Sequence, residues 1–189
     1  MRTVRGFFAA FFALAALAAC APAVAQLKAE NVYVGLSYGE ATAKDACAGL
    51  SGCSDRPDAL RGFAGYQFHP HLAVEAGYAN LGNVRATGGT FVRSHAWDAV
   101  LVASWPVLTR LDVFGKLGAA RGDQTGGGLL AAQKETNYHV TYGFGAQFNA
   151  TQNLGLRLEW QDYPHMGGGP VLPRGDIWTT TIGILWRFR

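Results

Sequence analysis

The sequence predicts an all-β fold, an eight-stranded antiparallel transmembrane β-barrel, and three observations support this prediction. Eight segments alternate between apolar and polar side chains with a period of two, which is the period of a β-strand. The connections between these segments are alternately short and long. Aromatic residues stand at both ends of the apolar side of several segments, as in strands that cross a lipid layer.

The last segment shows this pattern most clearly. One side of residues 176–188 is apolar, with Trp178 near the start, isoleucines in the middle, and Trp186 and Phe188 at the end. The other side carries threonine, glycine, leucine and arginine. A strand with two such sides fits a wall that has lipid outside and a narrow, packed interior.

The eight expected strands follow one another along the chain. They are residues 31–40, 59–68, 72–79, 95–105, 111–121, 136–148, 154–163 and 176–188. The even connections are short turns, His69 to His71, Pro106 to Arg110 and Asn149 to Asn153, whereas the odd ones are expected to have about 11 to 18 residues. Short turns at one end and long loops at the other are typical of outer-membrane barrels, with the turns in the periplasm and the loops outside the cell.

The aromatic residues of the apolar sides are expected to form two girdles, one at each membrane interface. The girdle near the loops comprises Tyr38, Tyr78, Trp97, Tyr138, Trp160 and Trp178, and the girdle near the turns comprises Phe68, Trp105, Phe148, Trp186 and Phe188. Trp97 and Trp105 are eight residues apart. At about 3.3 Å per residue and a tilt near 40°, this separation corresponds to roughly 20 Å across the membrane. The alternative fold, a soluble β-sandwich with scattered core aromatics, does not predict that the aromatic residues lie at two separate levels along the strands.

The opposite sides of the strands are predicted to face a narrow, filled lumen. Charged and amide side chains alternate there with glycines, and Asp98 and His139 belong to this side. Long charged side chains have to pair in such an interior, because an unpaired buried charge costs several kcal/mol. We therefore expect no wide continuous pore. The interior salt-bridge network that we expect consists of Arg61, Lys116 and Arg157 with Glu75 and Glu159.

Residues 1–25 are predicted to be a secretory signal peptide, followed by the barrel domain at residues 26–189. Two arginines open the first segment, an apolar run too short to span a bilayer as a helix follows, and Ala23-Val24-Ala25 has the small residues of a cleavage site. The tetrapeptide Leu17-Ala18-Ala19-Cys20 also matches the lipobox of bacterial lipoproteins. Lipidation of Cys20 therefore stays an open alternative to cleavage after Ala25.

Composition narrows the classes of function further. Two of the 16 basic side chains lie in the signal peptide, which leaves 14 against 13 acidic ones and gives no basis for nucleic-acid binding. Cys47 and Cys53 are expected to form a disulfide that closes a small loop in an oxidising compartment. A metal site at these cysteines is less favoured, because no histidine lies near enough in sequence to complete the ligands. No cofactor is expected.

Five motifs resemble those of the OmpA-type eight-stranded outer-membrane barrels, in the small stand-alone form without a peptidoglycan-binding domain. They lie at residues 62–68, 72–78, 114–118, 142–145 and 155–160, and the resemblance extends over residues 31–188. It implies an interior salt-bridge gate and a location in the bacterial outer membrane, among lipid and lipopolysaccharide. It also implies insertion by the barrel-assembly machinery, for which Trp186 and Phe188 resemble the recognition signal.

The sequence thus predicts a non-enzymatic, monomeric outer-membrane protein with a structural or surface-interaction role through its loops, which can bind an unknown surface ligand. A narrow channel for ions or small solutes is the first alternative, and a lipid-A-modifying enzyme is the second. Ser94 and His95 are adjacent, so their side chains face opposite sides of a strand, and the His-x-Ser arrangement of the deacylase family is missing. His69-Pro70-His71 is interpreted as a tight turn rather than a metal site.

Overall fold

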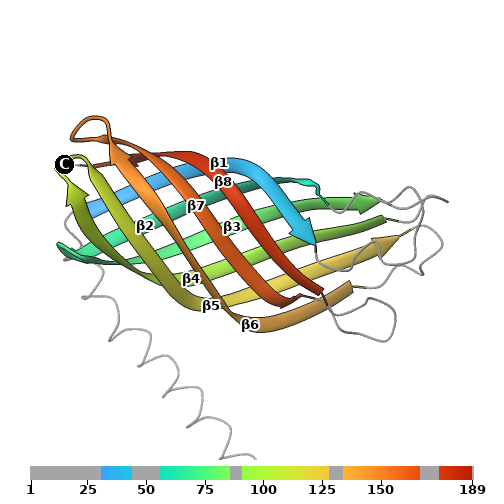
Figure 1. Cartoon of the computed structure of the whole chain (residues 1–189). Helices are drawn as coiled ribbons and strands as arrows, with labels where there is room; N and C mark the ends of the chain where they lie inside the picture. The colour runs from blue at the N-terminus through green and yellow to red at the C-terminus, as the bar shows by residue number, and fades with distance from the viewer. Residues whose placement is uncertain (1–30, 44–55, 86–90, 128–133, 167–174, 189) are drawn as a thin grey trace, which may run out of the picture.

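The computed structural model describes residues 31–43, 56–85, 91–127, 134–166 and 175–188, and these form one closed barrel (Figure 1). Its eight strands are antiparallel and neighbour one another in chain order. They are β1 (Val32–Ala43), β2 (Asp58–His69), β3 (Leu72–Arg85), β4 (Phe91–Leu108), β5 (Leu111–Gly127), β6 (Lys134–Asn149), β7 (Leu154–Met166) and β8 (Gly175–Arg187). The predicted fold class is confirmed.

The barrel closes because β1 pairs with both β2 and β8. Val34, for example, is the register partner of Ala64 on one side and of Trp186 on the other. Closure lets the main-chain groups of the wall find partners within the sheet, which a lipid environment requires. Among the described residues, none forms a helix long and apolar enough to cross a bilayer.

The two sides of the strands separate as the alternation predicts. On β1, Val34, Leu36 and Tyr38 are 40%, 52% and 55% exposed, whereas Tyr33 and Ser37 on the opposite side of the strand are buried. The other strands repeat this pattern, and the apolar sides face outward. The inward sides carry the charges, amides and glycines, together with some large apolar residues.

Several strands are longer than expected at the loop end. β4 begins at Phe91, β5 continues to Gly127 and β6 begins at Lys134, so that the corresponding connections are only residues 86–90 and 128–133. The last connection at the loop end, between β7 and β8, consists of residues 167–174. The expected length of about 11 to 18 residues was therefore wrong for these three connections. Where both sides of a sheet meet water, polar residues occupy both, and the alternation that marks a strand disappears.

The lumen is packed in layers. A turn-side layer consists of Tyr33, Phe63, Ala73, Val100, Val102, Phe114 and Leu185. A loop-side layer consists of Ala41, Ala43, Ala59, Ala79, Leu81, Ala96, Ala120, Tyr163, Met166 and Ile177. Glycines make room for the rings, since a Cβ at Gly35 would overlap Phe63 and a Cβ at Gly65 would overlap Tyr33. The charged residues lie between the two layers.

Candidate functional site: an ionic cluster in the lumen

Six charged side chains from five strands meet in the lumen, and we call them the ionic cluster. They are Arg61 on β2, Glu75 on β3, Asp98 on β4, Lys116 on β5, and Arg157 and Glu159 on β7. Each side chain is at most 4% exposed. Alternation along the strands places them there, because each occupies an inward position.

Arg61 is held by two carboxylates. Its Nε donates to Asp98 Oδ2 at 3.1 Å and its Nη2 to Asp98 Oδ1 at 2.6 Å, a two-pronged pairing that fixes the guanidinium plane. Its Nη1 lies 3.0 Å from Glu75 Oε1. A Cβ at Gly77 would lie 2.6 Å from Arg61 Nη2, so a glycine is needed where the guanidinium passes the wall.

Glu75 lies between the cations of the cluster. Arg157 Nη1 lies 2.7 Å from Glu75 Oε2, and the Tyr33 hydroxyl donates to the same oxygen at 3.1 Å. Lys116 Nζ is 3.8 Å from Glu75 Oε1 and 2.5 Å from Glu159 Oε1. Glu75 and Glu159 therefore each face three cations, and no pair among them can be removed without changing its neighbours.

The cluster is electrically balanced, with three cations and three carboxylates. The five residues expected from the sequence carry three positive and two negative charges, and Asp98 supplies the third carboxylate. The sequence placed Asp98 in the lumen but not in the network. The buried hydroxyl of Tyr163 also donates to Asp98 Oδ2, at 3.1 Å. Balance matters because the desolvation of buried ions is offset only when every charge is paired.

Aromatic rings cover the cluster on the turn side. The guanidinium carbon of Arg157 lies 4.7 Å from the ring centres of both Phe63 and Phe114. That of Arg61 lies 5.0 Å from the ring centre of Phe63. Such cation–π contacts stabilise a guanidinium where water is excluded. The role of these interior rings was not predicted, because phenylalanines on the inward side look like any other apolar residue of a strand.

A cavity of about 620 Å³ lies on the turn side of these rings, and we call it the vestibule. Its lining includes Pro70 and His71 from the first turn, together with Phe114 and Arg157 from the barrel interior. Arg157 also donates from Nη2 to Gln147 Oε1 at 3.1 Å, which ties the cluster to the polar vestibule wall. The vestibule thus reaches the cluster from one end of the lumen.

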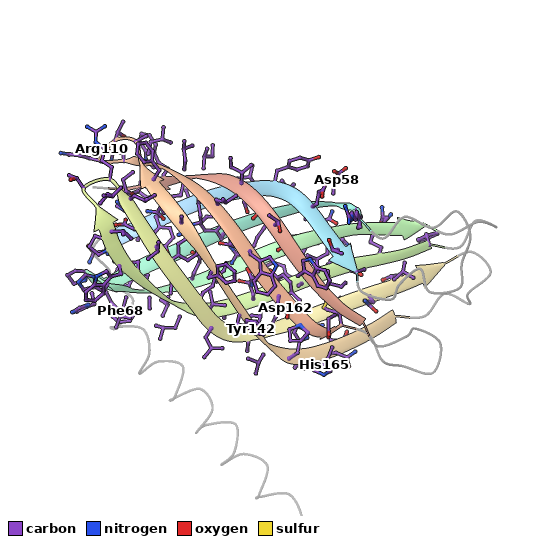
Figure 2. All side chains as sticks on the ribbon, viewed as in Figure 1. Asp58, Phe68, Arg110, Tyr142, Asp162 and His165 are labelled. Atoms are coloured by element: carbon purple, nitrogen blue, oxygen red, sulfur yellow. The ribbon has the colours of Figure 1, made fainter. Side chains whose placement is uncertain are left out.

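The eleven residues expected to form girdles all lie on the outer surface. Nine are exposed, and Trp160 and Trp178 are half-buried. Tyr142 shows how the loop-end side is organised, since its hydroxyl donates to Asp162 Oδ2 at 2.7 Å. Figure 2 shows this pair toward the loop end of the barrel, with Phe68 and Arg110 at the opposite, turn end.

The other residues singled out from the sequence lie outside the ionic cluster and the girdles. Cys47, Cys53, Cys20 and the predicted signal peptide lie outside the described residues. His71 stacks on Trp105 with ring centres 4.8 Å apart, and its Nδ1 contacts the Ser104 carbonyl oxygen, which is consistent with a structured turn. In the described part of the chain, no three histidine, cysteine, aspartate or glutamate residues are grouped as metal ligands would be.

Ser94 and His95 do not approach each other as catalytic partners. Ser94 is buried in the lumen and accepts a hydrogen bond from Gln124 at 3.4 Å. His95 lies on the outer surface, where its ring stacks on Tyr78 and its Nδ1 lies 3.0 Å from the Tyr78 hydroxyl. The strand wall separates the two side chains, as the alternation predicts.

The closed barrel, the lipid-compatible outer surface and the packed ionic lumen define an OmpA-like eight-stranded outer-membrane β-barrel. Residues 11–188 match the family model of the outer membrane protein beta-barrel domain, and the chain belongs to this family. Outer membrane protein A of Klebsiella pneumoniae is 26% identical over an alignment of 137 residues, which covers 67% of this chain and 40% of that protein. The chain spans about two fifths of the length of the curated relatives it matches.

Solved structures share the fold at low sequence identity. Neisserial surface protein A superposes with a TM-score of 0.67 and 14% identity, covering 84% of this chain and 97% of that one. The outer membrane enzyme PagL superposes with a TM-score of 0.50 and 13% identity, covering 82% and 99%. These likenesses show the fold alone. Together with the family, they place the chain in the bacterial outer membrane.

Proposed function

We propose that this chain is a non-enzymatic scaffold of the outer membrane whose structural or surface-interaction role is exerted by the parts that project from the barrel. The observation that supports this most is the neutral ionic cluster, enclosed between the turn-side and loop-side layers. At the level of the cluster, buried ion pairs between five strands fill the lumen and hold the wall rigid. Function in a rigid scaffold resides where the chain leaves it, at the loops.

The remaining features of the proposal come from the sequence. A disulfide between Cys47 and Cys53 would constrain the first loop and present it as a surface for a ligand. The chain would act as a monomer, surrounded by lipid and lipopolysaccharide. Trp186 and Phe188 end the last strand in aromatic residues, the form of signal through which the barrel-assembly machinery would insert the protein.

The vestibule favours one alternative function, a narrow channel, because it brings water-sized space as far as Arg157. Planar-bilayer recording of the purified protein distinguishes the two. We expect no steady conductance from a barrel that migrates as the compact, heat-modifiable form on gels. Steady openings that change in conductance in an Arg157→Gln variant would replace the scaffold with a channel.

An enzyme acting on lipid A is the second alternative, and the likeness to PagL concerns the fold alone. The separation of Ser94 and His95 by the strand wall argues against a serine–histidine pair here. Mass spectrometry of lipid A from cells with and without the protein tests this point. We expect identical lipid A species, and a species with altered acylation that depends on the protein would refute the non-enzymatic proposal.

A further inference from the structure

The vestibule at the turn end of the lumen meets the ionic cluster at one residue. Of the six side chains of the cluster, Arg157 is the one that lines this cavity. The two carboxylates that approach Arg157 do so at Nη1, which lies 2.7 Å from Glu75 Oε2 and 3.8 Å from Glu159 Oε2. The counter-ions of Arg157 therefore occupy one end of its guanidinium, and the opposite edge remains for other contacts.

This opposite edge carries two donors, Nε and Nη2. In a guanidinium, the Nε–H and one N–H of Nη2 point the same way, so that together they can hold both oxygens of a carboxylate. Arg61 uses this edge for Asp98, at 3.1 and 2.6 Å. On Arg157, Nη2 donates to a neutral amide oxygen, Gln147 Oε1, at 3.1 Å. Its buried Nε has no acceptor in hydrogen-bonding geometry among the described residues. An edge suited to a carboxylate thus holds only one amide oxygen.

Gln147 itself belongs to the vestibule wall, and its orientation is fixed from the turn side. Its Nε2 donates to Asn149 Oδ1 at 2.9 Å, and Asn149 Nδ2 donates to Asp112 Oδ2 at 2.7 Å. These contacts keep the amide nitrogen of Gln147 away from Arg157 and its oxygen toward the guanidinium. They also give the carboxylate of Asp112, the acidic residue of the lining, a partner on the wall. The Arg157 edge therefore faces the vestibule with a neutral acceptor in place of an anion.

The rest of the vestibule wall specifies the body of a ligand. Ala73, Val102 and Leu185 are buried side chains of the turn-side layer, and all three line the cavity. Its volume of about 620 Å³ is within the usual range of small-molecule pockets. Pro70 and Pro106 also belong to the lining and are exposed at the turn end, which is the periplasmic end of an outer-membrane barrel. The cavity therefore suits a small ligand with an apolar part that enters from the periplasm.

We propose that the vestibule binds a small periplasmic carboxylate with a short apolar body, whose two oxygens accept from Nε and Nη2 of Arg157. The carboxylate takes the place of the Gln147 amide oxygen, because a charge-assisted pair of hydrogen bonds is stronger than one bond to a neutral acceptor. A neutral amide ligand would only exchange one amide for another. A free small acid and the C-terminus of a peptide offer the same chemistry, and the experiment separates these two sources.

The experiment titrates the full barrel in lipid nanodiscs with N-acetylalanine and follows the Nε–Hε resonance of Arg157 by NMR spectroscopy. N-acetylalaninamide has the same body without the charge and is the matched control ligand. We expect a saturable shift of the resonance with the carboxylate, and an affinity at least about tenfold lower for the amide. Equal affinities of the two ligands, or a shift by the carboxylate that does not saturate, would overturn the proposal.

A pair of variants locates the site within the vestibule. Gln147→Glu supplies a carboxylate to the Arg157 edge from the chain itself and should weaken binding of N-acetylalanine by at least about tenfold. Gln67→Glu is the matched control, since Gln67 lines the same cavity but donates to the Pro70 carbonyl oxygen at 2.9 Å. It adds the same charge at the turn end, where water screens it, and should weaken binding by less than about threefold. Equal weakening by the two variants would contradict binding at Arg157.

Each variant must keep the heat-modifiable gel mobility of the native barrel, and Gln147→Ala replaces Gln147→Glu if the latter does not. Alanine leaves both donors of the edge open, so the affinity should be at least that of the native protein, and a loss of binding would overturn the proposal. N-acetyltrialanine separates the sources: binding at least about tenfold tighter than that of N-acetylalanine assigns the site to peptide C-termini, and equal or weaker binding assigns it to free acids. Displacement of N-acetylalanine by an equal concentration of inorganic phosphate would overturn the preference for a carboxylate. Failure of the vestibule site leaves the scaffold function intact, because that function resides at the loops.

Discussion

Replacing Glu75 by glutamine tests whether charge balance holds the lumen together. Glu75 is fully buried and lies within 4 Å of Arg61, Lys116 and Arg157. Glutamine keeps the size and can still accept from the Tyr33 hydroxyl. It removes one negative charge, however, and leaves three cations facing two carboxylates.

Removing one partner of a buried ion pair costs about 3–5 kcal/mol, because the other charge stays desolvated without compensation. Glutamine preserves part of the hydrogen bonding, so we expect the lower end, about 3 kcal/mol of lost unfolding free energy. The matched control is Asp123→Asn. Its partner Arg121 lies 3.6 Å away and is 46% exposed, so this change should cost at most about 1 kcal/mol.

The assay is equilibrium urea unfolding in detergent micelles, followed by tryptophan fluorescence and by heat-modifiable gel mobility. A second change, Lys116→Met, restores neutrality with two cations and two carboxylates. The double variant should be more stable than the sum of the single effects predicts, by at least about 1.5 kcal/mol, since neighbouring charges couple. A Glu75→Gln variant within about 1 kcal/mol of the native protein, or single effects that simply add, would refute the argument from charge balance.

Two further predictions concern the packing of the lumen and the side of each strand that faces lipid. Gly77→Ala should lower the unfolding free energy by about 1–3 kcal/mol in the same assay, because the new methyl group displaces the Arg61 guanidinium, and an unchanged midpoint would contradict this close approach. A cysteine at Leu36 should react with a lipid-soluble maleimide in the folded barrel, whereas a cysteine at Ser37 should react only after unfolding, and the reverse order would contradict the register.

The sequence was most informative where lipid meets one side of a strand. Leu36 and Ser37 differ in environment completely, so the alternation there is strict and the faces of the wall could be assigned before the structure was known. The same logic brought Arg61 and Glu75 into one lumen, since charged residues cannot face lipid. The alternation of apolar and polar residues does not indicate how far a strand continues beyond the membrane into water. For this reason the extensions of β3 to β6 at the loop end were not predicted.

The lumen was less predictable because its contacts depend on shear and tilt. Asp98 was assigned inward, but its pairing with Arg61 joins β2 and β4 across the interior, at a height that sequence separation does not define. Tyr163 was placed within a strand, but its hydroxyl contact with Asp98 spans 65 positions of the chain. A count of inward charges could have found Asp98, since the five expected residues leave one cation without a carboxylate.

Pro164 connects the local sequence of β7 to the pairing of the barrel wall. A barrel needs an unbroken ladder only where lipid surrounds it, because water can satisfy open main-chain groups beyond the membrane. β7 leaves β6 at Pro164, on the loop side of the Tyr142–Asp162 pair. Because the break lies at the loop end of β7, it costs little in stability. Moving the same proline two or four positions toward the turns should therefore prevent folding, because open main-chain groups would then face lipid.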